Sequence, residues 1–271
     1  MSITTTKDVI FDSENGLSLD IYEPDGGEVS KRAAIILVHG GGWFGGDKSA
    51  DADIATWFAE NGYLVAVPNY RLNDVAKFPA AYNDVFSAYE WLQASDLAFD
   101  HERIGAYGYS VGGTMAVELA NKFGIPTASV SGIFNIDGWM HAHGKTKPMA
   151  PPEIKAATPE RFGDAGPIGP VNEFFVWFVT SFFDQDDPHL TDRYKEGSPL
   201  HHVSVKSGPM FLANALNELV PAKEALDFSA ALVQAGVPVT TRFVDENHHA
   251  KAYWREVQDD VLAFFARYLQ A

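Results

Sequence analysis

The chain has 271 residues, and its 36 acidic side chains outnumber its 20 basic ones, which gives a formal net charge of −16 at pH 7. Such a charge repels a phosphate backbone and an anionic lipid surface, so we expect neither nucleic acid nor a membrane as a partner. The absence of cysteine excludes disulfides and a thiol nucleophile.

The amino-terminal stretch MSITTTKDVIFDSENG lacks a basic segment followed by an apolar one. No run approaches the roughly 20 apolar residues of a membrane span, so we expect a cytoplasmic protein. A hydrophobic content of 46% fits one large α/β domain with an insertion better than two independent domains. The oligomeric state stays open, with a homodimer as one alternative.

The chain opens with a predicted β-hairpin, because residues 9–11 and 17–22 alternate around Asn15-Gly16, a typical tight-turn pair. The run AAIILVHG at residues 33–40 is continuously apolar, as expected for a central strand of a parallel sheet that is buried on both faces.

Strands and helices then alternate along most of the chain. We expect further strands at residues 63–68, 104–107, 127–136, 209–213 and 237–244, the last as an inner strand. We expect helices at residues 50–60, from Phe78-Pro79 onward, and at 114–123, 221–234 and 252–269. This alternation predicts a mostly parallel sheet with helices on both faces.

Residues 138–203 interrupt the alternation. They contain glycine-proline turns at 166–167 and 169–170, followed by VNEFFVWFVTSFF, in which Phe174, Trp177, Phe178 and Phe182 recur at helical spacing. Any one of these aromatic side chains could fill an ordinary core, but as a group they favour a helical cap over a concave surface. We therefore expect a core of residues 1–137 and 204–271 and a cap insertion of residues 138–203.

The motif Gly108-Tyr109-Ser110-Val111-Gly112 lies between a predicted strand and a predicted helix. A G-x-S-x-G motif in that context is a sharp strand-to-helix turn that exposes a serine hydroxyl above the sheet, at the positive end of the following helix. We predict Ser110 as a nucleophile.

The sequence HGGGW at residues 39–43 follows the central strand. Consecutive glycines let backbone N–H groups approach a ligand, as an oxyanion hole requires, so we predict Gly41, Gly42 and Val111 as donors. The stretch also fits the dinucleotide pattern G-x-G-x-x-G. That pattern is expected after the first strand, with an acidic residue ending the next strand, whereas here two strands precede it and the next ends PNY.

A serine hydroxyl is too weak an acid to attack a carbonyl unaided, so it needs a histidine base and a carboxylate that orients the histidine. After a turn of this kind the order along the chain is serine, acid, histidine. The candidate bases are His248 and His249, which follow the last predicted strand, and the candidate acids are Glu218 and Asp137.

Together these motifs resemble a known group. HGGGW, NYRL, FPAAYNDVFSAYEWL, GYSVGG, SPLHHVS and the late histidine are similar to the α/β-hydrolase esterase/lipase group. That group includes hormone-sensitive-lipase-like carboxylesterases, feruloyl and acetyl esterases and arylformamidases. The likeness runs from about Val9 to the C-terminus outside the insertion, and it implies an α/β-hydrolase fold without naming a substrate.

The resemblance also selects among the candidates. Relatives place four residues between the last strand and the histidine, which leads from Val244 to His249 and leaves His248 as a loop or rim residue. Relatives often carry G-x-x-D after the preceding strand, where this chain has neither the glycine nor the aspartate. The corresponding positions are Asn217 and Glu218, and only Glu218 is a carboxylate. Asp137 is then expected to make a structural or hinge hydrogen bond.

Other side chains receive supporting roles. We expect Tyr70-Arg71 to order the HGGGW loop from behind. We interpret the remaining histidines as surface or cap residues rather than metal ligands, because no H-E-x-x-H motif or cysteine accompanies them: His141, His143, His201 and His202. The predicted substrate contacts are aromatic: Trp43, Tyr109, Trp139 and Trp177.

These residues predict a serine carboxylesterase that hydrolyses small esters with a short acyl or aryl group and needs neither a cofactor nor a metal. Its partner would be a small-molecule ester. One alternative is an arylformamidase that cleaves N-formylkynurenine, since that enzyme shares HGGGW and the triad. Another is a non-catalytic α/β-hydrolase-fold protein that only binds a ligand.

Overall fold

The computed structural model describes residues 2–143, 145–150, 171–184 and 191–269. Within this part of the chain, one sheet has the strand order β1-β2-β4-β3-β5-β6-β7-β8. The strands are β1 (Ile3–Asp12), β2 (Leu17–Pro24), β3 (Ala34–Val38), β4 (Leu64–Pro68), β5 (Ile104–Tyr109), β6 (Thr127–Val130), β7 (Met210–Ala215) and β8 (Val239–Val244). β1 and β2 run antiparallel to each other, and β2 runs antiparallel to β4. The six strands β3 to β8 all run parallel to one another.

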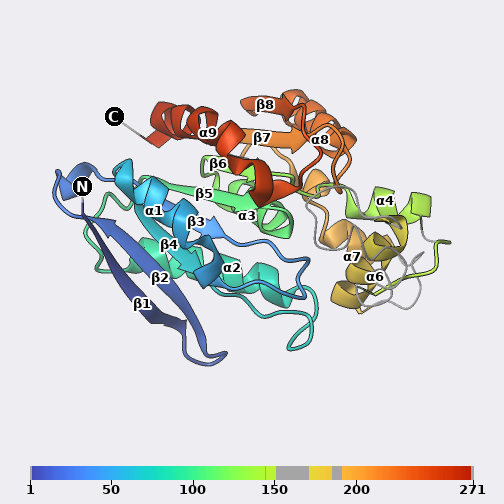
Figure 1. The fold of residues 1–271 in the computed structure, drawn as a ribbon, viewed down its shortest axis with the longest axis horizontal. Helices are drawn as coiled ribbons and strands as arrows, with labels where there is room; N and C mark the ends of the chain where they lie inside the picture. Colours follow the sequence, from blue (N-terminus) through green and yellow to red (C-terminus); the bar gives the residue numbers. More distant parts are fainter. Residues whose placement is uncertain (1, 144, 151–170, 185–190, 270–271) are drawn as a thin grey trace.

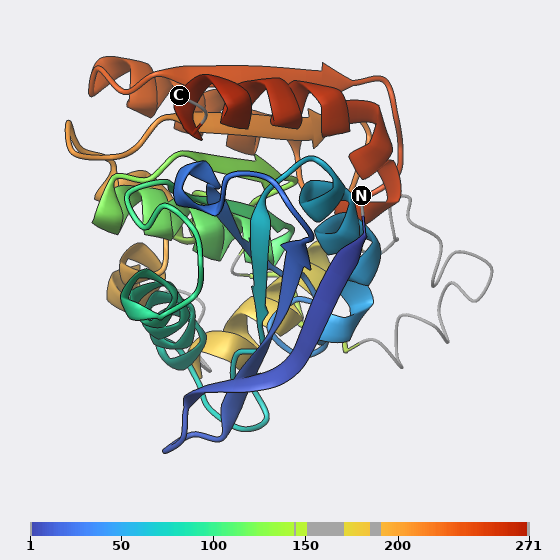
Figure 2. The ribbon, with the colours of Figure 1, turned by 90° about the vertical axis from the view of Figure 1, so that its left-hand side faces the viewer.

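The helices form layers on the two faces of the sheet (Figures 1 and 2). One layer contains α1 (Ala52–Glu60) and α9 (Trp254–Leu269), and the other contains α2 (Ala80–Ala94), α3 (Val111–Phe123) and α8 (Ala222–Gln234). Alternate residues of the buried central strand supply the two cores: Ile36 and Val38 face α2 and α3, whereas Ile35 and Leu37 face α1 and α9. The prediction of a mostly parallel sheet covered on both faces is confirmed.

The predicted amino-terminal hairpin is also confirmed, since β1 pairs with β2 on either side of Gly16, whose φ is +67°. A second antiparallel pairing, β2 with β4, joins this hairpin to the parallel strands. None of the described helices is long and apolar enough to cross a membrane.

Two predicted strands differ from the observed ones. The strand expected at residues 127–136 ends at Val130, because Ser131 turns the chain with φ +54° and α4 begins at Ile136. The apolar residues that follow are buried in a loop and a helix. A run of apolar residues in the sequence indicates burial but does not show whether the buried segment is a strand, a helix or a loop. The strand expected at residues 237–244 is not an inner strand, because β8 pairs only with β7 in the described sheet and exposes Thr240, Thr241 and Arg242.

Beyond the carboxyl ends of the parallel strands lie α4 (Ile136–His143), α6 (Val171–Phe183) and α7 (Thr191–Glu196), grouped at one end of the molecule (Figure 1). α6 packs on the loop after β3, where the rings of Phe182 and Trp43 stack with centroids 4.2 Å apart. The predicted glycine-proline turns at 166–167 and 169–170 lie outside the described residues.

Strand register places the functional motifs side by side. Val38 pairs with Gly108, Tyr109 with Val130, and Ala215 with Val244. The loops that leave β3, β5, β6, β7 and β8 therefore begin at a common edge of the sheet, where ligands bind in open α/β sheets.

Candidate active site

Ser110 occupies the sharp turn between β5 and α3, with φ +53° and ψ −132°. Its backbone N–H donates to the carbonyl of Val130 (2.8 Å), which fixes the turn to the end of β6. A Cβ on Gly112 would lie 2.2 Å from the carbonyl oxygen of Val38, so only glycine lets the turn approach β3 this closely. The predicted strand-to-helix turn is confirmed.

His249 lies between Ser110 and Glu218. Its Nε2 is 3.0 Å from Ser110 Oγ, and its Nδ1 is hydrogen-bonded to Glu218 Oε2. The Glu218 carboxylate is fully buried, whereas 18% of the His249 side chain is exposed, toward the cavity that it lines. The structure therefore brings a hydroxyl, an imidazole and a carboxylate into one chain of hydrogen bonds.

The other candidates for base and acid lie elsewhere. His248 is exposed and pairs with Glu246, with Nδ1 and Oε2 2.7 Å apart. Asp137 accepts from Ser198 Oγ (3.1 Å) and lies 2.8 Å from His201 Nε2, so it makes the structural contact expected of it. Asn217 is exposed and bonds the carbonyl of Glu246 through its backbone N–H.

Glu218 Oε1 faces a second set of donors, Ser131 Oγ (2.6 Å) and the backbone N–H of Ala215 (3.0 Å). Two donors on one oxygen leave Oε2 for His249 and hold the carboxylate in one orientation. The sequence did not single out Ser131, because it fell inside the expected strand at residues 127–136.

The glycine loop after β3 faces Ser110, and both Gly41 and Gly42 line the same cavity as His249. Gly41 has φ +119°, and a Cβ there would lie 2.0 Å from the carbonyl oxygen of Gly45. In the described residues neither glycine N–H donates a hydrogen bond to protein. The N–H of Val111, at the first position of α3, has no acceptor within its own helix. Three unpaired amides are thus available to an anion.

Side chains behind the loop hold it in place. Tyr70 donates its hydroxyl to the carbonyls of His39 (3.0 Å) and Gly40 (3.2 Å), and its ring stacks on that of His39. Burial lowers the pKa of His39, and its Nδ1 lies 2.8 Å from the Gly40 carbonyl, so the neutral ring donates from Nδ1. Arg71 does not share this role, because it pairs with the buried Asp84 instead.

A cavity of about 270 Å³ opens at Ser110. Apart from the glycines, Ser110, His249 and Ala250, its lining is mainly apolar: Phe44, Tyr109, Ile133, Phe174, Phe175, Phe178, Leu219, Val220 and Lys251. Three of the phenylalanines come from α6. A space of this size and polarity fits a small uncharged ligand.

Three of the four predicted substrate contacts do not line this cavity. Trp43, which has φ +60°, is fully buried and stacks on Phe182 instead. Trp139 packs on Phe175, and Trp177 packs on Phe44, so both support residues that line the cavity. Only Tyr109 faces it.

A buried carboxylate connects the turn at Ser110 to the loop that bears His249. Asp51 Oδ1 accepts from the Tyr109 hydroxyl (2.8 Å) and from Lys251 Nζ (3.1 Å). Burial raises the pKa of Asp51, and the contacts with Tyr109 and Lys251 oppose that shift. Asp51 thereby links Tyr109, which precedes Ser110, to Lys251, which lies two residues after His249.

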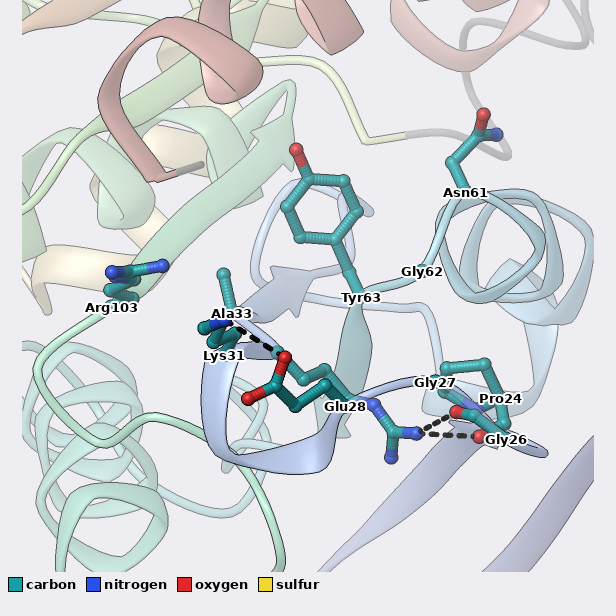
Figure 3. A pocket seen from close by; sticks show the side chains of 11 residues that line it. Pro24, Gly26, Gly27, Glu28, Lys31, Ala33, Asn61, Gly62, Tyr63 and Arg103 are labelled. Carbon is teal, nitrogen blue, oxygen red and sulfur yellow. Dashed lines mark hydrogen bonds and ion pairs between the residues drawn. The ribbon is translucent and has the colours of Figure 1, made fainter. Parts of the chain in front are cut away.

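A second cavity, of about 330 Å³, lies at the opposite end of the sheet, where Ala33, Tyr63 and Arg103 precede β3, β4 and β5 (Figure 3). Its cationic side chains are already paired: Lys31 with Glu28 (2.9 Å), and Arg32 with backbone carbonyls at Pro24 and Gly26. We assign no chemistry to this cavity.

His201 and His202 each pair with a single carboxylate. His202 Nδ1 is 2.7 Å from Glu118, and His201 Nε2 is 2.8 Å from Asp137. His141 is exposed, and the ring of His143 stacks on that of Trp139. In the described part of the chain no group of three or more histidine, cysteine or acidic side chains could hold a metal ion.

The parallel sheet, its two helical layers and the sharp turn at Ser110 define the class of fold: the chain has the α/β-hydrolase fold. Residues 19–131 match the family model BD-FAE. The solved structure of a thermophilic esterase from Thermogutta terrifontis superposes with a TM-score of 0.67, covering 98% of this chain and 91% of that one at 17% identity.

Two relatives of known activity are similar to the chain. It is 37% identical over 93 residues to ethyl acetate hydrolase from Pseudomonas putida, a match that covers 33% of this chain and only 29% of that protein. It is 26% identical over 242 residues to versiconal hemiacetal acetate esterase from Dothistroma septosporum, which covers 85% of this chain and 70% of the relative. The chain is thus similar to enzymes named as esterases, and it spans less than a third of the length of the ethyl acetate hydrolase.

Proposed function

We propose that this protein is a serine carboxylesterase that hydrolyses small uncharged esters with a short acyl or aryl group. The observation that carries the proposal is the hydrogen-bonded chain from Ser110 Oγ through His249 to Glu218, at the floor of an apolar cavity. The names of the two relatives, an ethyl acetate hydrolase and an acetate esterase, support ester chemistry.

In the first half of the reaction, Ser110 Oγ attacks the ester carbonyl carbon while its proton passes to His249 Nε2. The tetrahedral intermediate then collapses, the carbon–oxygen bond to the alcohol breaks, and His249 returns the proton to the departing oxygen. The products are an alcohol and an acyl group esterified to Ser110.

In the second half, His249 takes a proton from water as the water oxygen attacks the acyl carbon. The bond between the acyl carbon and Ser110 Oγ then breaks, His249 returns the proton to Ser110 Oγ, and the carboxylic acid leaves. Glu218 accepts the hydrogen bond from His249 Nδ1 throughout, which keeps Nε2 free to accept and stabilises the imidazolium that forms.

The negative oxygen of each tetrahedral intermediate requires preorganised donors. We assign this role to the backbone N–H groups of Gly41, Gly42 and Val111, which have no acceptor in the described protein. Each such donor is typically worth about 3 kcal/mol in the transition state.

The cavity argues for the substrate class. Its walls are phenylalanine, isoleucine, leucine and valine, and its one cation, Lys251, is already paired with Asp51 and Asp53. A charged or sugar-like group would lose its hydration there without gaining partners. We therefore expect activity on acetyl and other short or aryl esters, and little on highly polar ones.

The first test is Ser110→Ala. This variant should lose p-nitrophenyl acetate hydrolysis and labelling by a fluorophosphonate probe, because no oxygen remains to form the acyl bond. Its thermal melt should match that of the wild type, and Ser229→Ala on α8, which does not line the cavity, should keep full activity. A folded Ser110→Ala protein that still turns over the ester contradicts the proposal.

A panel of substrates then tests the proposed substrate class. Esters from acetyl to octanoyl, together with a feruloyl ester and N-formylkynurenine, should show the highest kcat/KM for the short-chain esters. Preferred cleavage of N-formylkynurenine would instead identify an arylformamidase. A wild-type protein that binds these compounds without labelling or turnover would identify a ligand-binding protein.

A further inference from the structure

Ser131 is the first residue after β6, and it is fully buried with φ +54°. Its backbone N–H donates to the carbonyl of Ala213 in β7 (2.8 Å). A positive φ is unfavourable for any residue other than glycine and persists only where surrounding contacts enforce it. Those contacts involve the serine hydroxyl.

The Ser131 hydroxyl has three partners: Glu218 Oε1 (2.6 Å), the Ala250 N–H (3.1 Å) and the Tyr253 hydroxyl (2.7 Å). A hydroxyl offers one proton and two acceptor positions. The amide can only donate and the ionised carboxylate can only accept, so Ser131 donates to Glu218. Tyr253 must therefore donate to Ser131. The proton and both acceptor positions of the Ser131 hydroxyl are then all used.

Tyr253 is suited to that donor role. Burial and the nearby charge of Glu218 raise its pKa, so the phenol keeps its proton across the neutral range. The network therefore retains one fixed direction of hydrogen bonds, from Tyr253 to Ser131 and from Ser131 to Glu218.

The network constrains both the acid and the base. A glutamate has one more rotatable bond than an aspartate, so its carboxylate needs more contacts to stay in one orientation. Ala250 directly follows His249 and also has a positive φ, +51°, and its N–H ends on the same hydroxyl. One oxygen thus connects the side chain of the acid to the backbone of the base.

We infer that Ser131 is a positioning residue for the proposed esterase: its hydroxyl aligns the Glu218 carboxylate and the His249 loop so that the triad forms. The inference rests on the proposed function and adds a fourth residue to its machinery. Ser131 acts through Glu218 and does not touch the substrate, since it does not line the cavity.

The test is Ser131→Gly, which removes the hydroxyl and suits the positive φ. Loss of a hydrogen bond to a charged group should lower kcat for p-nitrophenyl acetate by about 10- to 100-fold. KM should stay within about twofold of the wild-type value, because the cavity walls are unchanged. Tyr253→Phe leaves the bond from Ser131 to Glu218 in place, so its kcat should fall less than that of Ser131→Gly.

Ser129→Ala is the matched control. Ser129 is a buried serine two residues earlier, in β6, and its hydroxyl has no hydrogen-bond partner in the described structure. This variant should keep the wild-type kcat. If Ser131→Gly does not fold, Ser131→Cys, which keeps a weak donor of similar size, takes its place with the same expected fall in kcat.

A double variant separates positioning from simple stability. In a Glu218→Gln background the Ser131→Gly change should lower kcat by less than threefold, because the carboxylate that it orients is gone. A wild-type kcat in the single variant, or an equal fall in both backgrounds, overturns the inference. If Ser110→Ala stays active, the proposed function itself is wrong; if Ser110→Ala is inactive and Ser131→Gly is normal, only the inference is wrong.

Discussion

Left-handed backbone conformations gather at the candidate site. Six described residues other than glycine have positive φ, and four of them adjoin the cavity or the triad: Trp43, Ser110, Ser131 and Ala250. Each conformation costs of order 1–3 kcal/mol, so their surroundings must compensate. At Ser110 the backbone N–H is bonded to β6, and at Ala250 it is bonded to Ser131. These bonds hold the turn of Ser110 and the loop after His249 in conformations that are otherwise unfavourable.

Glu218 gives a sharp prediction at the residue scale. Glu218→Gln keeps the shape of the side chain but cannot accept from His249 as a carboxylate does, so kcat for p-nitrophenyl acetate should fall by about 10⁴-fold. His248→Ala should leave kcat unchanged, because that ring pairs with Glu246 in solvent. A larger loss from Asp137→Asn than from Glu218→Gln would reassign the acid.

The sequence located some of these residues and missed others for physical reasons. Ser110 lies in a motif whose spacing is set by backbone contacts, so the pattern carries its geometry. Glu218 could be chosen because it was the only carboxylate at its position. Ser131 left no trace, since neither a positive φ nor a contact 87 residues away in the chain is visible in a hydrophobic run. Trp43 adjoins the glycines in sequence, yet its ring stacks on Phe182 and does not line the cavity.

At the scale of elements, the ion pairs of Lys251 join the loop before α9 to the start of α1. Lys251→Met keeps the aliphatic stem but leaves Asp51 buried without its cation, so the free energy of unfolding should fall. Because Lys251 is partly exposed, we expect a loss of about 1–3 kcal/mol in urea unfolding.

Asp51→Asn added to Lys251→Met should recover part of that loss, since the unpaired charge is removed. Lys223→Met is the control, because its pair with Asp227 lies on the surface of α8. An unchanged unfolding free energy in Lys251→Met would show that Asp51 does not need the cation.

Element boundaries were predictable where burial and periodicity agree. The apolar run of β3 and the alternation of β1 and β2 both have the expected structure. β6 is shorter than expected, because buried loops also contain apolar runs. β8 lies at the edge of the sheet, which its own sequence does not show, because the pairing order depends on all the strands. Sequence alone does not show that β3 lies between β4 and β5.

At the scale of the whole molecule, one histidine links pH to stability. The hydrogen bond with Glu118 raises the pKa of His202 above 6.5 in the folded protein. A group whose pKa rises on folding stabilises the folded state fully below its unfolded pKa, and that contribution is lost as pH rises through the folded pKa. The pair of His202 and Glu118 should therefore stabilise the folded state near pH 6, and this stabilisation should be lost as the pH rises through the folded pKa of His202.

The measurement is the melting temperature of the wild type and of His202→Gln at pH 6 and pH 8.5. The variant should melt below the wild type at pH 6, and the difference should shrink at pH 8.5. His248→Gln is the control, since that ring lies in an exposed loop. A His202→Gln difference that grows with pH would show that the pair acts as a neutral hydrogen bond.

The origin of the cavity walls has a consequence for how such a protein can diversify. Phe174, Phe175 and Phe178 belong to α6, whereas Ser110, Glu218 and His249 are borne by turns that leave the sheet. One wall of the cavity is thus encoded in a stretch of the gene apart from the three residues of the proposed triad. Substitutions in α6 can therefore change the shape of the cavity without altering the proposed triad.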